Sequence, residues 1–369
     1  MRVLEGAQGP RVVVRGQEVL NFCSNNYLGL ADDLRLKEAA IECLKTEGGG
    51  SGASRLVCGN MTAHEELEKA LAKFKGTERC LLFNTGYMAN IGIISSLFGK
   101  GDELFLDRLN HASVIDGAML SGATFHRYPH KDMKGLERLL QNASSSKKRC
   151  IITDSIFSMD GDFAPLEEIV SLAKRYECTV MIDEAHALGV IGRQGRGLAE
   201  HFGLEKEIDI QMGTLSKAAG AFGAYCCGSK ELIEFLINKA RSFIYTTGMP
   251  PSVAAMAHKA IEIIQAEPQR RQQLWDNAHY MRLELKGMGF DTLYSQTPII
   301  PMMVYNSELA VTFSNKLLEI GIFVSAIRPP TVPPNTARLR LTVMATHTKQ
   351  DLDYALKQFR KIGKELALI

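Results

Sequence analysis

Residues 178–192 read CTVMIDEAHALGVIG, an apolar run that ends at Asp183 and is followed by Glu184 and small residues. A short apolar run without alternation is typical of a strand that is buried on both faces of a parallel sheet. In open sheets of this kind, ligands bind outside the carboxyl ends of the strands. The stretch therefore predicts an α/β fold that places Asp183 at a ligand-binding edge.

Similar apolar runs occur on both sides of this stretch, and they alternate with helical patterns such as residues 88–98 and 166–176. This alternation predicts a mostly parallel sheet with helices on both faces. Seven runs are expected to form the sheet: RCLLF (79–83), ELFLD (103–107), TFHRY (124–128), RCIITD (149–154), CTVMID (178–183), IDIQMG (208–213) and GAYCCG (223–228).

The pattern changes after Pro250 and Pro251. A long helical pattern leads into further strands near 299–305, 322–327 and 337–343 and then into a closing amphipathic helix. We expect a smaller α+β domain at the C-terminus. The predicted boundaries are an N-terminal segment 1–45, a large domain 46–267 and a small domain 268–369.

The letters DEAH in the quoted stretch also name a class of nucleic-acid helicases. Such a motor needs a phosphate loop of the form G-x-x-x-x-G-K-S/T, and residues 48–55, GGGSGASR, lack the lysine. The 43 Lys and Arg residues barely exceed the 41 Asp and Glu residues, so no excess positive charge is available for a phosphate backbone. Nucleic acid is therefore not an expected partner, and Asp183 and His186 need another explanation.

The remaining composition indicates a cytoplasmic protein outside the membrane. The eight cysteines contain no C-x-x-C pair, and most lie in apolar segments, which is typical of reduced core residues. The N-terminus lacks the apolar core of a signal peptide, and no stretch approaches the roughly 20 apolar residues of a membrane span. His126 and His130 are separated by Pro129, which breaks the helix that would align them, so no metal site is expected.

Lys217 follows another predicted strand and is surrounded by small or hydroxyl residues: Thr214, Ser216, Gly220 and Gly223. A lysine in such surroundings suits covalent attachment to the aldehyde of a cofactor whose ring must approach closely. Upstream, residues 80–92, CLLFNTGYMANIG, read as a strand, a turn at Thr85–Tyr87 and a helix, whose first amides can hold a phosphate. A lysine, an acid at Asp183 and a phosphate cup together favour pyridoxal phosphate (PLP) as the cofactor.

At these residues the sequence resembles the α-oxoamine synthases, fold-type I PLP-dependent transferases that condense an amino acid with an acyl thioester and release carbon dioxide. The resemblance runs from about Asn21 to the C-terminus. Eight segments carry it: LNFCSNNYLGL (20–30), GSGASRLVCGN (50–60), DRLNHASVIDG (107–117), DSIFSMDGDFAPL (154–166), IDEAHALGVIGRQGRG (182–197), GTLSKAAGAFG (213–223), YTTGMPP (245–251) and AIRPPTVPPNTARLRLT (326–342).

The resemblance implies roles for the cofactor residues. Lys217 binds the PLP aldehyde and also acts in catalysis, Asp183 pairs with the pyridine nitrogen, and His111 stacks on the ring. His186 lies near the phenolic oxygen together with Ser155 or Ser158, of which the family pattern favours Ser158. Further phosphate contacts are implied for Thr85, Gly86, Tyr87, Thr214, Ser216 and, from the neighbouring subunit of a homodimer with shared active sites, Thr246.

The substrate residues lie in the last predicted strand. In ARLRLTV (337–343), Arg338, Arg340 and Thr342 share one face, and a guanidinium there can grip a carboxylate through two hydrogen bonds. Arg340 matches the carboxylate-binding arginine of the family, whereas Arg338 is expected to face solvent. Asn25 resembles a residue at the substrate end of the pocket.

Within the family, residues 326–342 are most similar to the branch that joins L-alanine to a pimeloyl thioester in biotin synthesis. The acyl donor is a coenzyme A ester or an acyl carrier protein, which these residues do not distinguish. A glycine C-acetyltransferase or another family member is the alternative, and a cofactor-free binding protein is the remote one. The family usually has a further helix before the segment matched by Arg11–Leu20, and part of the acyl-chain recognition lies there. The given sequence lacks a match to that helix, so the resemblance does not predict the acyl specificity.

Overall fold

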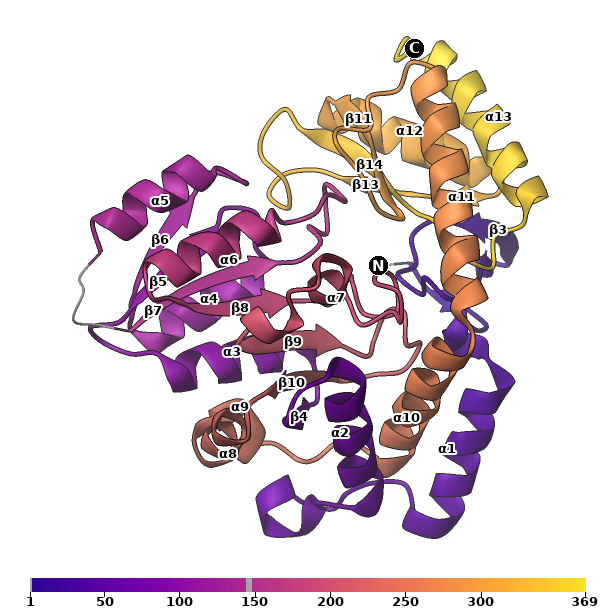
Figure 1. Cartoon of the computed structure of the whole chain (residues 1–369). Coiled ribbons are helices and arrows are strands. Elements are labelled where there is room, and N and C mark those ends of the chain that lie inside the picture. The colour runs from indigo at the N-terminus through magenta and orange to yellow at the C-terminus, as the bar shows by residue number, and fades with distance from the viewer. Residues whose placement is uncertain (1, 144–147) are drawn as a thin grey trace. The chain divides into compact units, whose positions relative to one another are not determined.

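The computed structural model describes residues 2–143 and 148–369, which form two compact units (Figure 1). The large unit comprises Leu34–Phe157 and Phe163–Ala266. The small unit comprises the residues up to Asp33, Ser158–Asp162 and Glu267–Ile369. The predicted domain boundaries, 1–45, 46–267 and 268–369, remain a prediction.

The large unit is built on a sheet of seven strands among the described residues, in the order β4-β10-β9-β8-β7-β5-β6. Only β10 runs against its neighbours β4 and β9, and the other neighbouring pairs are parallel. The strands are β4 (Arg79–Phe83), β5 (Glu103–Asp107), β6 (Thr124–Tyr128), β7 (Arg149–Asp154), β8 (Thr179–Asp183), β9 (Ile210–Thr214) and β10 (Ala224–Gly228).

Most strands of this sheet are nearly continuous apolar runs because both faces of the sheet are covered, whereas the edge strand β6 is more polar and partly exposed. In β5, Leu104 and Leu106 face one core and Phe105 faces the opposite side, yet all three are fully buried. Helices α3 (Gly86–Leu97) and α4 (Ala112–Ser121) cover one face, and α5 (Met133–Gln141) and α6 (Leu166–Arg175) cover the other (Figure 1). The predicted α/β class, with a mostly parallel seven-stranded sheet, is confirmed.

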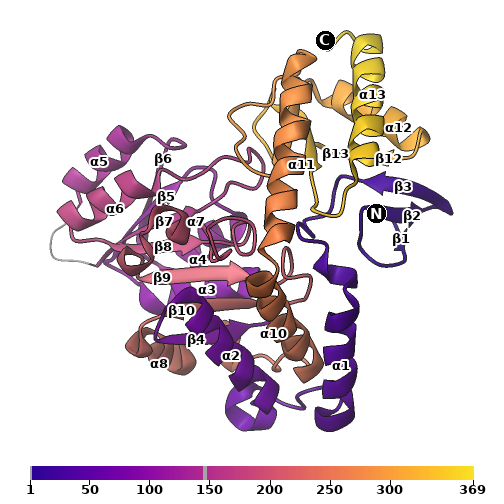
Figure 2. The same cartoon turned by 45° about the vertical axis from the view of Figure 1, so that its right-hand side comes forward.

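The other helices of the large unit lie around the β4 edge of the sheet or in connections between strands. Helix α1 packs along α10, as both views show (Figures 1 and 2). These helices are α1 (Leu34–Glu47), a π-helix (Arg55–Gly59), α2 (Thr62–Lys75), α7 (Leu198–Phe202), a 3₁₀ turn (Glu205–Glu207), α8 (Lys230–Lys239), α9 (Arg241–Ile244) and α10 (Pro251–Ala266).

The small unit contains two sheets. One has the order β1-β2-β3-β12 and the other β11-β14-β13. Their strands are β1 (Leu4–Glu5), β2 (Arg11–Val14), β3 (Gln17–Asn21), β11 (Ile299–Tyr305), β12 (Ile322–Phe323), β13 (Ser325–Ile327) and β14 (Ala337–Thr342). The predicted single strand 322–327 is therefore wrong, because β12 pairs with β3 while β13 pairs with β14.

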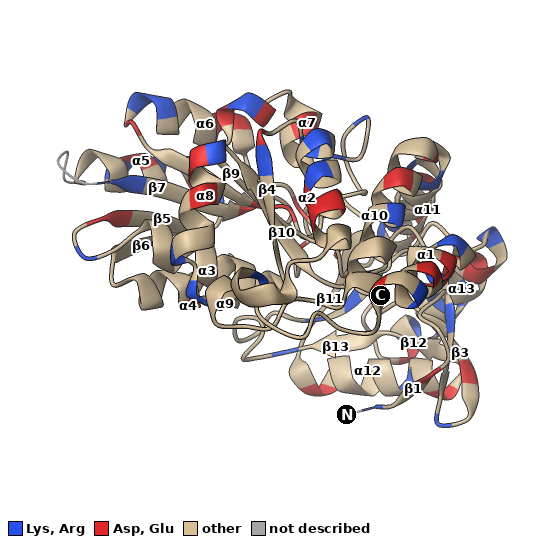
Figure 3. Cartoon of the chain, turned by 90° about the horizontal axis from the view of Figure 1, so that it is seen from below, with Lys and Arg blue, Asp and Glu red and all other residues tan. Residues whose placement is uncertain are grey.

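Three helices complete the small unit: α11 (Pro268–Gly287), α12 (Ser307–Glu319) and α13 (Lys349–Glu365), besides a 3₁₀ turn at Leu30–Asp32. Their apolar faces enclose a core with the alternate residues of β14, Leu339 and Leu341. Figure 3 shows Lys and Arg interspersed with Asp and Glu along the helices, without a large block of one sign. No helix among the described residues is both long and apolar enough to cross a bilayer.

Candidate active site

The topology of the large unit gathers the predicted cofactor residues at one edge of its sheet. Strands β8 and β9 are parallel, and β4 runs in the same direction because both β4 and β9 are antiparallel to β10. The carboxyl ends of these strands therefore meet at one edge. Asp183 ends β8, Thr214 ends β9, and the turn at Thr85 follows β4. This is the edge where open α/β sheets bind ligands.

Asp183 is held in a fixed orientation by neutral donors. Its Oδ2 accepts a hydrogen bond from Asn90 Nδ2 at 2.8 Å, and its Oδ1 accepts one from the backbone N–H of Ala185 at 2.9 Å. The side chain is 6% exposed, so the carboxylate is shielded from bulk water. A buried carboxylate with neutral donors keeps its negative charge available for a positively charged group nearby.

A second carboxyl group stands beside Asp183. Asp154 is its partner in the β7–β8 ladder and accepts a hydrogen bond from the backbone N–H of His111 at 3.2 Å. Burial, followed by the charge of Asp183, raises the pKa of Asp154 well above its ordinary value. Two neighbouring buried carboxyl groups resist ionising together, which is the physical reason that the pKa of Asp154 is raised.

Lys217 lies in the loop that follows β9. Its Nζ is 2.9 Å from Nε2 of His186, so the lysine and the histidine of the DEAH segment meet although they are far apart in sequence. Lys217 is half-buried and His186 is 7% exposed. An amine in contact with an imidazole can exchange a proton with it, which suits acid–base chemistry at this place.

The loop that carries Lys217 is shaped by hydroxyl groups around Gly223. The hydroxyls of Thr214 and Ser216 both donate to the carbonyl of Gly223, at 2.8 and 3.3 Å. Gly223 has φ of +116°, a conformation that side chains rarely adopt. The structure thus assigns both hydroxyl hydrogens to the loop, and any phosphate contact by Thr214 or Ser216 remains a prediction.

Helix α3 begins beside β9. Thr85 is its N-cap, and Thr85 Oγ1 accepts from the backbone N–H of Met88 at 3.1 Å. A Cβ on Gly86 would lie 3.3 Å from Cε of Met212, so glycine allows the helix start to lie close to the strand. The first amides of a helix have no partner inside it and carry the positive end of its dipole, which suits a phosphate. The Tyr87 hydroxyl is exposed and bonds to Asp116.

His111 caps helix α4 and presents an exposed imidazole at the same edge of the sheet. Its Nδ1 lies 2.7 Å from Oγ of Ser113 and accepts the backbone N–H of Ser113 at 3.3 Å. The ring is therefore oriented by its own helix. Its predicted stacking on a cofactor ring remains a prediction.

The remaining phosphate and oxygen contacts are assigned less directly. Thr246 is half-buried, and its Oγ1 accepts from Nδ2 of Asn84 at 3.4 Å. Ser155 is fully buried, and its hydroxyl donates to the carbonyl of Asp183. Ser158 belongs to the small unit, where its carbonyl accepts from Arg340. The choice between Ser155 and Ser158 as a cofactor contact thus remains open.

In the small unit, Arg340 is held by neutral groups. Its Nε donates to the carbonyl of Ser158 at 2.5 Å. Both Nη1 and Nη2 approach Oδ1 of Asn25, at 3.2 and 3.3 Å, and Nη1 also lies 2.9 Å from the Thr342 hydroxyl. No carboxylate neutralises this guanidinium within the described residues, so its charge suits an anionic ligand. The predicted Arg340 and Asn25 pair is in contact.

Arg338 corrects the expectation that this side chain faces solvent. Arg338 is 3% exposed and forms an ion pair with Asp160, and its Nη1 also donates to the carbonyl of Met159 at 3.3 Å. The alternation of β14 places both arginines on one face. The loop Ser158–Asp162 covers that face, and a loop so distant in sequence cannot be read from a local pattern.

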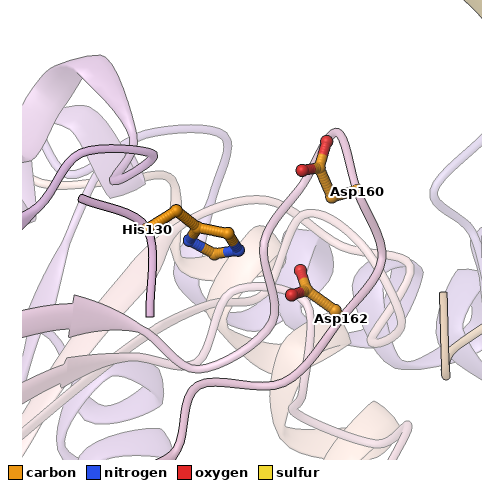
Figure 4. A group of neighbouring side chains, drawn as sticks. All are labelled: His130, Asp160 and Asp162. Atoms are coloured by element: carbon orange, nitrogen blue, oxygen red, sulfur yellow. The ribbon is translucent and has the colours of Figure 1, made fainter. Parts of the chain in front are cut away.

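Figure 4 shows His130 together with two aspartates of this loop, Asp160 and Asp162. His130 and Asp160 each have another partner. His130 Nδ1 lies 3.0 Å from Asp107, and Asp160 pairs with Arg338. His130 also belongs to the other unit. We therefore do not assign these side chains as a metal site.

Two residues of the edge were missed by the sequence prediction. Asn90 and Ser113 connect Asp183 to His111 and are both fully or almost fully buried. Asn90 is a polar residue among the otherwise apolar buried positions of α3, and that mismatch is the signal that would have found it. Ser113, two residues after His111, carries no comparable signal.

The residues of this edge fit PLP. Asp183 offers an oriented negative charge, Lys217 an amine at the same edge, and helix α3 the amides of its first turn after Thr85. Gly86 leaves room where a larger residue would meet Met212. These features match the three demands of the cofactor, which are an aldehyde partner, a pyridinium partner and a phosphate cup.

Comparisons with known proteins agree with this chemistry. The family described as aminotransferase class I and II matches residues 17–359. An 8-amino-7-oxononanoate synthase from Geobacter sulfurreducens is 52% identical, over all of this chain and 95% of that protein. These matches extend across both units and are not limited to the cofactor residues.

Solved structures agree as well. A serine palmitoyltransferase from S. paucimobilis with a bound PLP–myriocin aldimine has a TM-score of 0.97 at 35% identity, over all of this chain and 94% of that chain. An 8-amino-7-oxononanoate synthase from Francisella tularensis has a TM-score of 0.83 at 30% identity, over 94% of this chain and 98% of that chain. The predictions of a fold-type I PLP enzyme and of PLP as its cofactor are confirmed.

Proposed function

We propose that this chain, which belongs to the aminotransferase class I and II family and within it to the α-oxoamine synthases, joins L-alanine to a pimeloyl thioester. The products are 8-amino-7-oxononanoate, carbon dioxide and the free thiol, in a step of biotin synthesis. The observation that carries this proposal is the 52% identity, over the whole chain, to a protein named for that product.

Bound PLP supplies an aldehyde that captures the amino group of the substrate and a ring that stabilises negative charge on its Cα. The protein must then keep the ring nitrogen protonated and move protons at Cα. Asp183 suits the first task, because Asn90 and the Ala185 amide hold its carboxylate without neutralising it.

Lys217 suits the second task. With PLP bound, Lys217 would serve as the base that removes the proton from Cα of alanine and later returns one. His186, in contact with Lys217 Nζ, is positioned to share that proton. His186 or His111 donates a proton to the thioester oxygen as the new carbon–carbon bond forms.

The substrate carboxylate needs a fixed cation, and Arg340 is the candidate. Its two Nη groups converge on the single oxygen Oδ1 of Asn25. A carboxylate offers two oxygens to the same pair of nitrogens and is therefore a stronger acceptor. We assign Asn25 to orient the guanidinium and to remain beside the bound carboxylate.

The phosphate group is assigned to the start of α3, at Thr85, Gly86 and Tyr87, with Thr214 and Ser216 nearby. Thr246 is assigned to the phosphate of the neighbouring subunit, so that a homodimer shares its two sites. Measuring the mass of the loaded protein in solution tests the dimer, and a monomer with full activity would exclude the shared contact.

A cytoplasmic location is part of the proposal. The eight cysteines of the chain are all free, and most are buried. Unpaired cysteines are typical of the reducing cytoplasm, where coenzyme A and carrier-protein thioesters are also made.

The direct test is release of free thiol by the PLP-loaded protein. We expect release with L-alanine and either pimeloyl-CoA or pimeloyl-acyl carrier protein, and the two donors distinguish the physiological thioester. Lys217→Ala is the matched control and should release none. Release confined to glycine with acetyl-CoA, or to L-serine with palmitoyl-CoA, would assign the chain to another branch of the family.

A further inference from the structure

The side chain of Asn90 connects two groups of the candidate site. It projects from α3 and is 1% exposed. Its Nδ2 donates one hydrogen to Oδ2 of Asp183 at 2.8 Å and the other to Oγ of Ser113 at 2.9 Å. Both amide hydrogens are therefore used inside the protein.

The orientation of this amide follows from the chemistry of its neighbour. A carboxylate can only accept hydrogen bonds, so the nitrogen of Asn90 must face Asp183. In that orientation Oδ1 of Asn90 is buried and has no partner among the described residues. A buried oxygen without a partner is uncommon and costs stability. The fold accepts this cost, because turning the amide would place its oxygen against the carboxylate.

The hydrogen bond from Asn90 to Ser113 influences the tautomer of the His111 imidazole. Because Ser113 Oγ accepts from Asn90, its own hydrogen is free to point to Nδ1 of His111, 2.7 Å away. The backbone N–H of Ser113 donates to the same nitrogen. Nδ1 therefore accepts, and the neutral imidazole of His111 carries its hydrogen on Nε2.

We propose that Asn90 is a positioning residue, whose amide fixes the carboxylate of Asp183 and, through Ser113, the tautomer of His111. The proposal rests on the proposed function, since that function assigns Asp183 and His111 to the cofactor. It goes further by making one neutral side chain responsible for both. Asn90 itself acts through the two residues and takes no part in proton transfer.

The first experiment measures the tautomer of His111 by ¹⁵N NMR of the full-length protein labelled in histidine, with His111→Gln used to assign the signals. We expect the ring of His111 to carry its hydrogen on Nε2. In Asn90→Leu and in Ser113→Ala, the fraction of rings that carry the hydrogen on Nδ1 should rise, because only the backbone N–H of residue 113 is then left to favour an accepting Nδ1. An unchanged tautomer in Asn90→Leu would overturn this half of the proposal.

The second experiment measures the affinity of the full-length protein for PLP by fluorescence titration. Asn90→Leu should bind PLP on the order of 10-fold more weakly, since one hydrogen bond to a carboxylate is lost. Ser113→Ala keeps the bond between Asn90 and Asp183 and should bind as the wild type does. Equal losses of PLP affinity in the two variants would contradict the claim that Asn90 acts separately on Asp183 and, through Ser113, on His111.

Two further variants test whether the effects of Asn90→Leu come only from a general loss of stability. Asn277→Leu removes a buried asparagine of the small unit that bonds the carbonyls of Met344 and His347, and it should change neither readout. If Asn90→Leu does not fold, Asn90→Asp retains the shape but sets a second carboxylate against Asp183 and should weaken PLP binding even more. Neither measurement uses an acyl substrate, so a wrong branch assignment would leave both results unaffected.

Discussion

The end of β8 and the middle of β14 each carry two charged side chains close together in sequence, and in each place the two are held differently. At β8, Asp183 is bonded by the neutral Asn90 amide and a backbone N–H. Its neighbour Glu184 is fully buried in an ion pair with Lys75 and also accepts from the backbone N–H of Ala199.

Strand β14 repeats the contrast with the opposite sign. Arg340 is bonded by neutral oxygens of Ser158, Asn25 and Thr342, whereas Arg338 pairs with Asp160. In a poorly solvated site, a charge that meets an opposite charge is neutralised within the fold. A charge held by neutral dipoles retains its field for a ligand. The comparison predicts that Asp183 and Arg340 act on ligands, while Glu184 and Arg338 stabilise the structure.

The largest effect is expected for Asp183→Asn. Asparagine can still accept from Asn90, but it no longer provides the negative charge that keeps the ring nitrogen protonated. Thiol release should fall on the order of 10³-fold, within the range typical of proton-handling groups, with little change in the thermal midpoint. Turnover near that of the wild type would contradict the prediction that the charge of Asp183 acts on a ligand.

Glu184→Gln tests the structural side. It leaves the ammonium group of Lys75 buried without its counter-charge, which should lower the free energy of unfolding by about 3–5 kcal/mol in urea titrations. The double variant Glu184→Gln with Lys75→Met should recover most of this loss. Lys349→Met, which breaks the exposed pair with Asp353, is the control and should leave the midpoint unchanged. A large loss of turnover without a loss of stability would contradict this assignment.

Arg340→Ala should raise KM for L-alanine roughly 10- to 100-fold, the value of a hydrogen-bonded charge. Arg340→Lys should recover little, because a lysine cannot present two parallel donors. Arg338→Met is the matched change on the same face of β14 and should lower stability while KM stays close to the wild-type value. Initial rates of thiol release against alanine concentration provide the measurement. An equal rise of KM in the Arg340 and Arg338 variants would contradict the assignment of Arg340 to the substrate and of Arg338 to the structure.

His347 shows that neutral partners alone do not make a titratable group functional. It is buried and bonded only by neutral groups, but we assign it no ligand. Its Nδ1 accepts from the N–H of Met344, and Nε2 bonds the carbonyl of Asn21, so both nitrogens are used. Burial lowers its pKa from 6.5 to about 4. The folded state binds fewer protons, so stability is complete above the unfolded pKa and is lost as pH falls towards the folded one.

This shift corresponds to about 2 kcal/mol of stability lost between pH 7 and pH 5. Urea unfolding at the two pH values should show the loss in the wild type and a smaller one in His347→Gln. An equal decline in both proteins would assign the pH dependence to other groups.

Most strands of the large unit could be predicted because a strand that is buried on both faces has consecutive apolar residues. The small unit was less accessible. Residues 322–327 read as one strand, yet Val324, buried between β12 and β13, marks the point where the chain passes from one sheet to the other. Local alternation indicates an extended backbone but not its partner.

The candidate site divides in the same way. Asp183 and Lys217 could be proposed from their positions after apolar strands, and the resemblance to a family extended the proposal to His111, His186 and Arg340. The solvent-facing prediction for Arg338 was wrong, because the loop that carries Asp160 covers it. Asn90 was missed, because a polar residue on the buried face of a helix does not by itself indicate its hydrogen-bond partner.

The fold class, the cofactor and the strand ends where the chemistry is expected follow from the amino-acid sequence, because they depend on residue type and on spacing within a segment. Which charges are neutralised depends on contacts between distant segments. Lys75 and Glu184, Asp160 and Arg338, and Asn90 and Asp183 are each far apart in the chain. Whether a charge is neutralised within the protein or can act on a ligand depends on the residue that folding places next to it. The periodicity of the sequence does not identify that residue.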